Sequence, residues 1–422
     1  MKAIVKISLS VMLICLQLTL PAQDLSEWRG EGRTGKYPAS NLQRSWPEDG
    51  PELLWLNSEL PKGFSSMAFG QGLIFLTGIE EETDVLLAIN SEGEIEWKTG
   101  FGRAWTDSFS DSRGTPTIEG NYVYVSSGMG DLACVEIATV QIVWSLKASE
   151  IHGGTYGQWG LAESLLIDQE KLYFTPGGSE TTTIALNKLT GELIWKSPSL
   201  KDNPAYVSPI IIEEAGKKYL INISASYVFS VDVSDGTIAW KVNHLDINAE
   251  KSKEVWSDAP MIKCVTPLYQ DGKLFITGGY EHGSFMLQLS EDGDEASVLW
   301  TDSVLDVHHG GVILVDGYIY GSNWINNGDG NWCCLEWETG KVMYEEHWKN
   351  KGSLIYAEGL LYIYDEKRGN VGLLNANPNQ FDLISSFRVT EGSGPHWAHP
   401  AISNGNLYVR HGNALMAYNI SE

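Results

Sequence analysis

The stretch Thr183-Ile-Ala-Leu-Asn-Lys-Leu-Thr-Gly-Glu-Leu-Ile-Trp195 decides the fold of this chain. Two short apolar segments flank a polar turn that contains glycine, and the second segment ends in tryptophan. This pattern predicts a β-hairpin. It recurs in recognisable form at residues 86–97, 132–144 and 229–240, so the chain is built from repeats.

Eight repeats can be counted from the aromatic residue that ends each of these hairpins. The eight residues are Trp55, Trp97, Trp144, Trp195, Trp240, Trp300, Tyr344 and Phe387. A second hairpin with a polar-glycine turn lies upstream of most of them, as at Asp271-Gly272 and Asp316-Gly317. Each unit is therefore predicted to have four antiparallel strands, A to D, with no helix between units. Four-stranded units at a period of about 40 to 60 residues are typical of β-propeller blades.

The two ends of the repeat region predict how the ring closes. The last unit supplies strands A to C within Ala401–Ile420, and the sequence then lacks a D strand. Near the other end, Glu52-Leu-Leu-Trp55 reads as a D strand without a preceding A to C. We expect this N-terminal strand to complete the last blade, which would remove an exposed sheet edge.

The repeat also resembles a known family. The pattern Ala185-x-Asn187-x-x-Thr190-Gly191-x-x-x-Trp195 is similar to the tryptophan-docking motif of pyrroloquinoline quinone (PQQ)-type propellers, and partial copies cover nearly all of residues 51–420. Glu27-Trp28-Arg29-Gly30 resembles the start of exported PQQ-like repeat proteins. The resemblance implies an all-β, eight-bladed propeller of four-stranded antiparallel blades. Its known members include dehydrogenases and non-catalytic relatives, such as the periplasmic scaffold lipoprotein of the outer-membrane assembly machine.

Three regions are expected along the chain. Residues 1–22 read as a signal peptide, because Lys2 and Lys6 precede the apolar run Ile7–Leu20 and a small residue, Ala22. Residues 23–50 form an N-terminal arm, and residues 51–420 form the propeller. Cleavage near Ala22 would leave a periplasmic or secreted protein. Lipid attachment at Cys15 is the rival interpretation, but Ile14 is not the small residue that such a site requires.

Composition limits the partners. The formal net charge of −25 would repel nucleic acid, and no segment after the signal peptide resembles a membrane span. No CxxC or CxxCH motif occurs, so neither a thioredoxin-like site nor attached c-type haem is indicated. We therefore expect a monomer that binds a protein or a saccharide.

The unusual residues fall on one predicted face. In a four-stranded blade the B–C and D–A connections emerge at the same end, and all nine histidines are predicted to lie in or beside these connections. Several tryptophans join them in long D–A connections, which are often functional. The predicted binding residues at the mouth of the central channel are Arg103, Trp105, His152, Trp159, His308, His309, Asn323, Trp324, His396, Trp397, His399, Arg410 and His411.

Catalysis is less well supported by the sequence. The resemblance implies that a PQQ enzyme would hold Ca²⁺ through Glu, Asn and Asp side chains, and oxygen donors are available on this face at Glu163, Asp302, Asp306, Asn323 and Asp329. No set of them matches the enzymes' motifs position by position, so no catalytic residue is assigned. The histidine pairs His308-His309 and His396-x-x-His399 lack diagnostic metal spacing, and no metal site is predicted. The adjacent Cys333-Cys334 read as buried strand residues rather than a vicinal disulfide.

The sequence thus favours a non-catalytic binding or scaffold propeller that requires no cofactor. A dehydrogenase for alcohols or sugars that uses PQQ with Ca²⁺ is the alternative.

Overall fold

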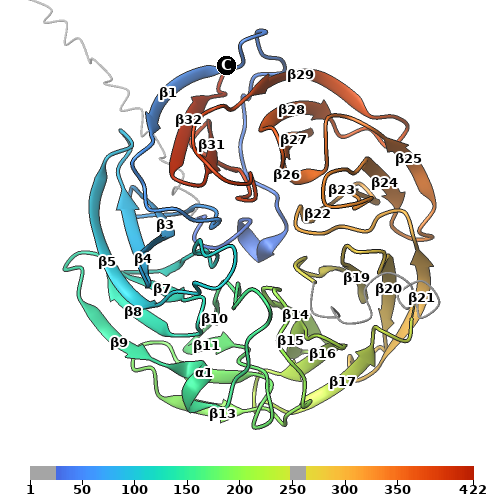
Figure 1. The fold of residues 1–422 in the computed structure, drawn as a ribbon. Coiled ribbons are helices and arrows are strands. Elements are labelled where there is room, and N and C mark those ends of the chain that lie inside the picture. Colours follow the sequence, from blue (N-terminus) through green and yellow to red (C-terminus); the bar gives the residue numbers. More distant parts are fainter. Residues whose placement is uncertain (1–24, 248–262) are drawn as a thin grey trace, which may run out of the picture.

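Alternating apolar residues between glycine-containing turns form 32 β-strands in the computed structural model, which describes residues 25–247 and 263–422. The strands make eight four-stranded antiparallel sheets arranged as blades around a central channel (Figure 1). The predicted eight-bladed propeller is confirmed. The predicted signal peptide lies outside the described residues, and no helix in the described ranges is long and apolar enough to cross a membrane.

The blades follow the chain in order. Blade 1 comprises β2 (Ala68–Gly70), β3 (Leu73–Glu80), β4 (Thr83–Ile89) and β5 (Ile95–Arg103). Blade 2 comprises β6 (Thr117–Glu119), β7 (Tyr122–Ser126), β8 (Leu132–Glu136) and β9 (Ile142–Leu146). Blade 3 comprises β10 (Leu166–Asp168), β11 (Lys171–Phe174), β12 (Ile184–Asn187) and β13 (Leu193–Lys196). Blade 4 comprises β14 (Ile210–Glu214), β15 (Lys217–Ile223), β16 (Tyr227–Asp232) and β17 (Ile238–Asn243).

The second half repeats this arrangement. Blade 5 comprises β18 (Leu268–Gln270), β19 (Lys273–Thr277), β20 (Ser284–Leu289) and β21 (Ala296–Asp302). Blade 6 comprises β22 (Val312–Val315), β23 (Tyr318–Ser322), β24 (Trp332–Glu336) and β25 (Val342–Glu346). Blade 7 comprises β26 (Gly352–Ala357), β27 (Leu360–Asp365), β28 (Asn370–Asn375) and β29 (Asp382–Arg388). Blade 8 comprises β30 (Ala401–Ser403), β31 (Asn406–His411), β32 (Ala414–Asn419) and β1 (Glu52–Asn57).

Blade 8 closes the ring as the sequence predicts. Strand β1 pairs antiparallel with β32, with Glu52 opposite Asn419 and Asn57 opposite Leu415. The two ends of the propeller therefore share one sheet, and the edge of β32 is covered. The blue and red strands lie side by side in Figure 1.

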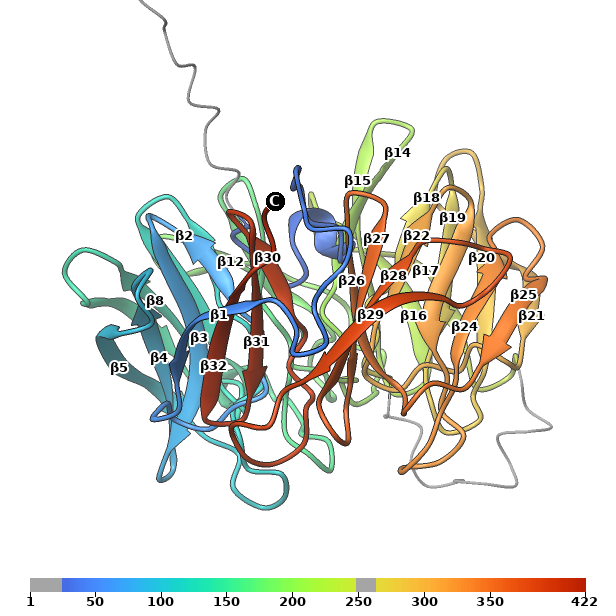
Figure 2. The same cartoon turned by 90° about the horizontal axis from the view of Figure 1, so that it is seen from above.

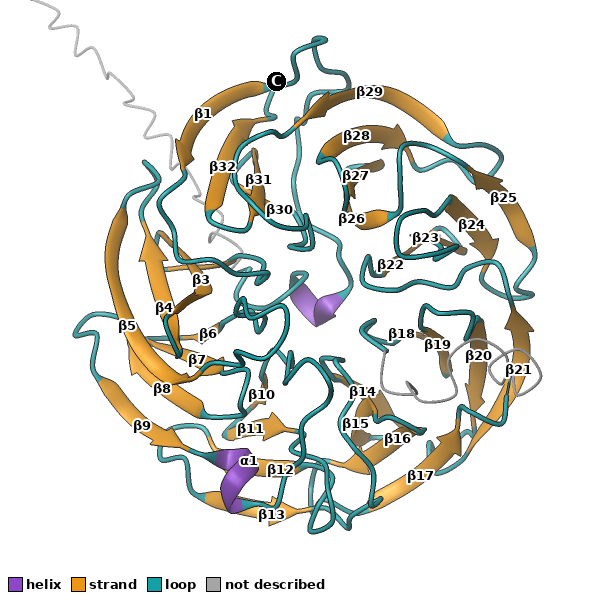
Figure 3. Ribbon diagram, viewed as in Figure 1, coloured by secondary structure: helices purple, strands orange, loops and turns teal. Residues whose placement is uncertain are grey.

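Two short helical turns interrupt the all-β pattern (Figure 3). Helix α1 (Ala148–Ile151) lies in the connection between blades 2 and 3, and the 3-10 turn η1 (Glu31–Arg33) lies in the central channel. The expectation of no helix between units is therefore wrong at α1. A single turn there is compatible with the length of that connection and leaves the blade order unchanged.

The repeated tryptophans join one blade to the next. The indole Nε1 of Trp195, in β13, donates to the carbonyl of Val233 in blade 4 at 3.2 Å. Its ring lies against Gly236, which has φ +83°, and a Cβ built on that glycine would stand 2.5 Å from the ring. Trp55, Trp144 and Trp300 meet Gly93, Gly191 and Gly340 in the same way. The repeated turn glycine therefore provides both a left-handed backbone and room for the indole.

A matched pair of substitutions separates these two roles. Gly236→Ala is expected to lower the free energy of unfolding by about 2–4 kcal/mol, because the methyl group displaces Trp195 and the backbone is strained. Gly216 has φ +78° with no atom near the position of a Cβ. Gly216→Ala should therefore cost only the backbone strain, about 1–2 kcal/mol. Urea unfolding of both variants measures the difference, and equal losses would contradict a docking role for Gly236.

The N-terminal arm (residues 25–50) crosses the channel. Its backbone accepts hydrogen bonds from Phe69 in blade 1 and Ile118 in blade 2, at 2.9 and 2.7 Å. Farther along, Tyr356 in blade 7 donates to the carbonyl of Gly35 at 2.9 Å. The view in Figure 2 places η1 toward one end of the ring, the end at which the β14–β15 turn emerges.

Two buried arginines attach the arm to further blades. Arg29 donates through Nη2 to the carbonyl of Val312 at 2.8 Å and through Nη1 to that of Leu354 at 3.2 Å. Arg33 donates to the carbonyl of Leu165 at 2.7 Å and pairs with Glu27 at 3.2 Å. The arm thereby contacts blades 1, 2, 3, 6 and 7 through hydrogen bonds at the centre of the ring.

Candidate functional site

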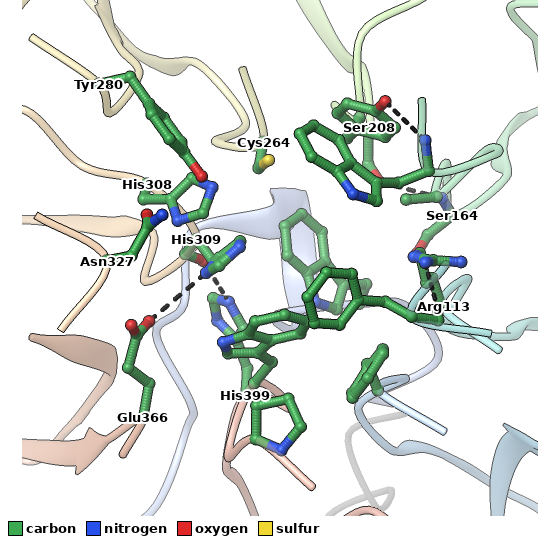
Figure 4. Close-up of a pocket in the computed structure, with 18 of the residues that line it drawn as sticks. Arg113, Ser164, Ser208, Cys264, Tyr280, His308, His309, Asn327, Glu366 and His399 are labelled. Atoms are coloured by element: carbon green, nitrogen blue, oxygen red, sulfur yellow. Dashed lines mark hydrogen bonds and ion pairs between the residues drawn. The ribbon is translucent and has the colours of Figure 1, made fainter. Parts of the chain in front are cut away.

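A cavity of about 480 Å³ lies at the end of the channel where the B–C and D–A connections converge. Most of these connections supply part of its lining, so the site exists only because the ring is closed. The lining residues are Trp28, Phe64, Phe109, Arg113, Trp159, Ala162, Ser164, Tyr206, Ser208, Cys264, Tyr280, His308, His309, Asn327, Glu366, Lys367, Pro395, Trp397 and His399. Figure 4 shows these side chains pointing toward a shared space, with the N-terminal arm behind them.

Trp28 contributes the part of the lining that the arm supplies. Its ring meets His399 edge-on, with the ring centroids 5.3 Å apart. Because Trp28 precedes the anchored Arg29, its position is set by the hydrogen bonds of the arm to the blades. The arm therefore closes the cavity on the channel side.

Aromatic rings make two walls of the cavity. On one wall the indole of Trp397 lies 4.9 Å from Phe64, 5.2 Å from Phe109 and 4.8 Å from His309, centroid to centroid. On the other wall Trp159 lies 5.8 Å from Tyr206, whose hydroxyl accepts a hydrogen bond from the Trp159 backbone N–H at 3.2 Å. Such walls provide apolar faces with polar edges, which suit the stacking of a ring-shaped group.

The hydrogen bonds of His399 fix its protonation. Arg29 can only donate, so His399 Nδ1 accepts from it at 2.8 Å. The carbonyl of His309 can only accept, so His399 Nε2 donates to it at 2.9 Å. His399 is therefore a neutral imidazole, in agreement with burial and the charge of Arg29, which lower its pKa to about 3. The chain Arg29–His399–His309 connects the arm to the cavity.

A charge network occupies the side of blade 7. Glu366 lies 2.7 Å from Lys351 Nζ and 3.5 Å from His309 Nδ1. Burial alone would raise the pKa of Glu366, but His309 and Lys351 together lower it below its ordinary value. The carboxylate is thus ionised and already paired. His308 is held neutral, because burial lowers its pKa well below the ordinary value.

Five of the thirteen predicted binding residues line this cavity: Trp159, His308, His309, Trp397 and His399. Trp324 lies behind it, where its ring stacks on the lining residue Tyr280 at 4.7 Å. The structure does not bring the other predicted residues into the lining, and their role in binding stays a prediction.

Those other residues make local contacts. Arg103 pairs with Asp131 at 2.6 Å, and Arg410 donates to backbone carbonyls around Ser65 and Thr77. His396 lies stacked on His411 at 3.6 Å, and both nitrogens of His411 face carbonyl oxygens. The remaining three are Trp105, which packs against Gly128 and Gly160, His152, which is buried, and Asn323, which donates to Glu345.

Sequence reasoning missed several lining residues. Phe64, Phe109, Tyr206 and Tyr280 are ordinary loop aromatics, and no local motif distinguishes them. Trp28 lies in the motif Glu27-Trp28-Arg29-Gly30, but nothing in that motif predicts that the arm crosses the channel. Arg113 was identifiable as a cation in a long D–A connection, yet its place in the cavity depends on the folded loop.

The oxygen donors considered for a calcium–quinone site do not fit such a site. Asp302 accepts the N–H groups of Val304 and Leu305, and Asp306 accepts those of Glu281 and Gly283. Glu163 accepts from the backbone N–H of Thr175, Asn323 from that of Asn331 and Asp329 from that of Gly330, so each of the five side chains already accepts a backbone N–H group. None of the five lines the cavity, and no group of three or more metal-ligating side chains is found within residues 25–247 and 263–422.

The cysteines show no reactive character. None of the four described cysteines forms a disulfide, and Cys333 and Cys334 are buried in β24 as predicted. Burial raises the pKa of the cavity residue Cys264 to about 12, so its thiol stays protonated at neutral pH.

Sequence comparison identifies curated relatives of this chain. The outer membrane protein assembly factor BamB of Shewanella oneidensis is 24% identical over 205 residues, which cover 46% of this chain and 47% of that protein. BamB of Yersinia pestis is 19% identical over 285 residues, covering 64% of this chain and 65% of that protein. The chain thus spans about half to two thirds of the length of these relatives.

Solved structures share the fold. BamB from Moraxella catarrhalis superposes with a TM-score of 0.59 at 14% identity, covering 87% of this chain and 97% of that one. Quinohemoprotein alcohol dehydrogenase from Comamonas testosteroni gives a TM-score of 0.51 at 10% identity, covering 94% and 81%. At such identities the likeness concerns the fold alone. A sequence profile described as outer membrane protein assembly factor BamB matches residues 82–346, which is more than half of the chain. The chain therefore belongs to this family of PQQ-like β-propellers.

Proposed function

We propose that this chain is a non-catalytic binding propeller whose mouth cavity takes a ring-shaped ligand of saccharide size. The observation that carries the proposal is the pair of aromatic walls, Trp397 with Phe64 and Trp159 with Tyr206, around a cavity of about 480 Å³. That volume lies in the range of small-molecule sites. Sugar rings present apolar faces to aromatic side chains and hydroxyls to polar ones, such as Ser164, Ser208 and Asn327.

Several features support binding over catalysis. The lining imidazoles of His308 and His399 are held neutral by burial, and His399 has both ring nitrogens engaged. Glu366 is bound to Lys351, and the thiol of Cys264 is protonated. The donor set for a quinone-bound calcium ion is used elsewhere, so the PQQ dehydrogenase alternative has no specific observation in its favour.

A protein partner is the competing occupant, because the relatives are named as assembly factors. The cavity has the N-terminal arm behind it and is walled by rings, a shape that favours a compact group over a long chain segment (Figure 4). We also infer export to the periplasm or beyond, which the outer-membrane role in the relatives' name supports.

Binding to an array of neutral, amino and acidic oligosaccharides tests the proposal, followed by calorimetric titration of the strongest probes. Trp397→Ala and Trp159→Ala should each weaken binding about tenfold or more, since buried aromatic anchors dominate such sites. Trp348→Ala is the control, because Trp348 lines a separate groove with Tyr344 and Phe381. Equal affinity of all three variants, no binding on the array, or dye reduction after addition of PQQ and Ca²⁺ would each contradict the proposal.

A further inference from the structure

One arginine of the cavity lining, Arg113, has no ion-pair partner within the described ranges. Arg113 lies in the connection between β5 and β6, and its guanidinium faces the cavity from the side opposite His309 (Figure 4). Its Nη2 donates to the carbonyls of Ser108 and Phe109, which hold the side chain in place. Within the described ranges, its Nε and Nη1 make no hydrogen bond and no carboxylate lies within 4.0 Å of it.

No acid within the described ranges forms an ion pair with this arginine. Asp84 and Asp111 attract Arg113 through space and offset part of its charge, but Asp84 already accepts from the backbone N–H of Gly128. Among the lining residues that the structure describes, Glu366 is the only carboxylate, and it is paired with Lys351. Lys367 adds a second cation at the rim.

This local excess of positive charge stands out in a protein of net charge −25. The lining imidazoles His308 and His399 are neutral, so they do not alter the charge of the cavity. A cavity with a net positive charge and apolar walls concentrates anionic ligands.

The geometry favours a carboxylate over other anions. Because Nη2 donates to Ser108 and Phe109, Nη1 or Nε of Arg113 remains available for a charge-assisted hydrogen bond to one carboxylate oxygen. A phosphate would call for several cations or a nest of backbone N–H groups, whereas this site offers one inward guanidinium between aromatic walls. We propose that the ligand is an acidic saccharide in which the carboxylate of a uronic acid residue pairs with Arg113 while the sugar ring stacks on Trp397 or Trp159.

This inference rests on the proposed function, since it names the class of saccharide that the same cavity takes. It adds one specific requirement, namely that affinity depends on the carboxylate. The matched probes are therefore digalacturonate and digalactose, which differ in the carboxyl groups. Both are titrated calorimetrically into the full-length mature protein.

The wild-type protein is expected to bind digalacturonate about 10- to 100-fold more tightly than digalactose, the range of a desolvated charge-assisted pair. Arg113→Gln should remove this preference for digalacturonate over digalactose, while Arg113→Lys should keep part of it. Arg103→Gln is the control, because Arg103 lies in the adjoining strand but pairs with Asp131 and Glu150 outside the cavity lining. Binding of the neutral probe shows in each variant that the cavity is folded.

The outcomes separate the two proposals. Equal affinity of the wild type for both probes, or an unchanged preference in Arg113→Gln, would overturn the carboxylate assignment and leave the binding function intact. Failure of both probes to bind would overturn the saccharide site itself. Tighter binding of benzoate than of digalacturonate would keep the carboxylate and overturn the sugar.

Discussion

Replacing Arg29 with methionine is expected to lower the free energy of unfolding by about 3–5 kcal/mol, the largest loss predicted for a single side chain here. Arg29 is 2% exposed and donates to the carbonyls of Val312 and Leu354 and to His399 Nδ1. Methionine fills a similar volume but has no donor, so three buried acceptors would lose their partner. Burial lowers the pKa of Arg29 to about 10, and the side chain is therefore still charged at neutral pH.

Arg44 offers a matched control on the same arm. It is exposed and makes one hydrogen bond, from Nη1 to the carbonyl of Glu358 at 2.7 Å. Arg44→Met should change stability by about 0.5 kcal/mol or less. Chemical denaturation of both variants gives the comparison, and similar small effects would mean that the blades close without the arm.

Arg29→Met should also weaken ligand binding in the mouth cavity. Trp28 is adjacent to Arg29 in sequence and packs on His399, so loss of the anchor frees one part of the lining. We expect weaker binding of any ligand of the mouth cavity in Arg29→Met than in Arg44→Met. The arm thus connects the stability of the ring with the shape of its site.

Much of the fold could be predicted because its signals are local and repeated. The hairpin ending in Trp195 specifies a strand pair, a turn glycine and a docking indole. The structure confirms the pairing of β12 with β13, the positive φ of Gly191 and the docking of Trp195 against Gly236. The missing D strand of the last repeat predicted the pairing of β1 with β32. Each of these features depends on residues within one unit or on a simple count of strands.

The candidate site was only partly predictable, because its residues meet through closure of the ring. Trp159 and Trp397 could be placed by assigning each to a D–A connection. Arg410 and His411 were assigned to the same end, but their donors satisfy nearby backbone carbonyls, which no sequence pattern reveals. The path of the arm was equally hidden, because its contacts lie hundreds of residues away in sequence, as between Arg29 and Leu354.

Acid should destabilise the wild-type protein through His399 more than through any exposed histidine. Burial and the charge of Arg29 lower the pKa of His399 to about 3 in the folded protein, whereas in the unfolded chain it is about 6.5. The unfolded state therefore binds more protons between these values, so the stabilising contribution is complete above pH about 6.5 and is lost as the pH falls toward 3. For one such group the free energy of unfolding changes by at most about 1.4 kcal/mol per pH unit.

Several groups make opposing contributions to the pH dependence of the free energy of unfolding, so a matched variant must isolate the contribution of His399. Burial also lowers the pKa of His396 to about 3, which acts in the same direction, but it raises the pKa of Glu163 to about 8, which adds stability as the pH falls. His399→Gln keeps one acceptor for Arg29 and one donor for the carbonyl of His309 without titrating. Between pH 6.5 and 4.5 the wild type should therefore lose up to about 2.7 kcal/mol more than this variant. Replacing the exposed His347 with glutamine shows whether removal of any imidazole has this effect. Parallel curves of unfolding free energy against pH for the wild type and His399→Gln would contradict the prediction, because His399 would then gain its proton without destabilising the fold.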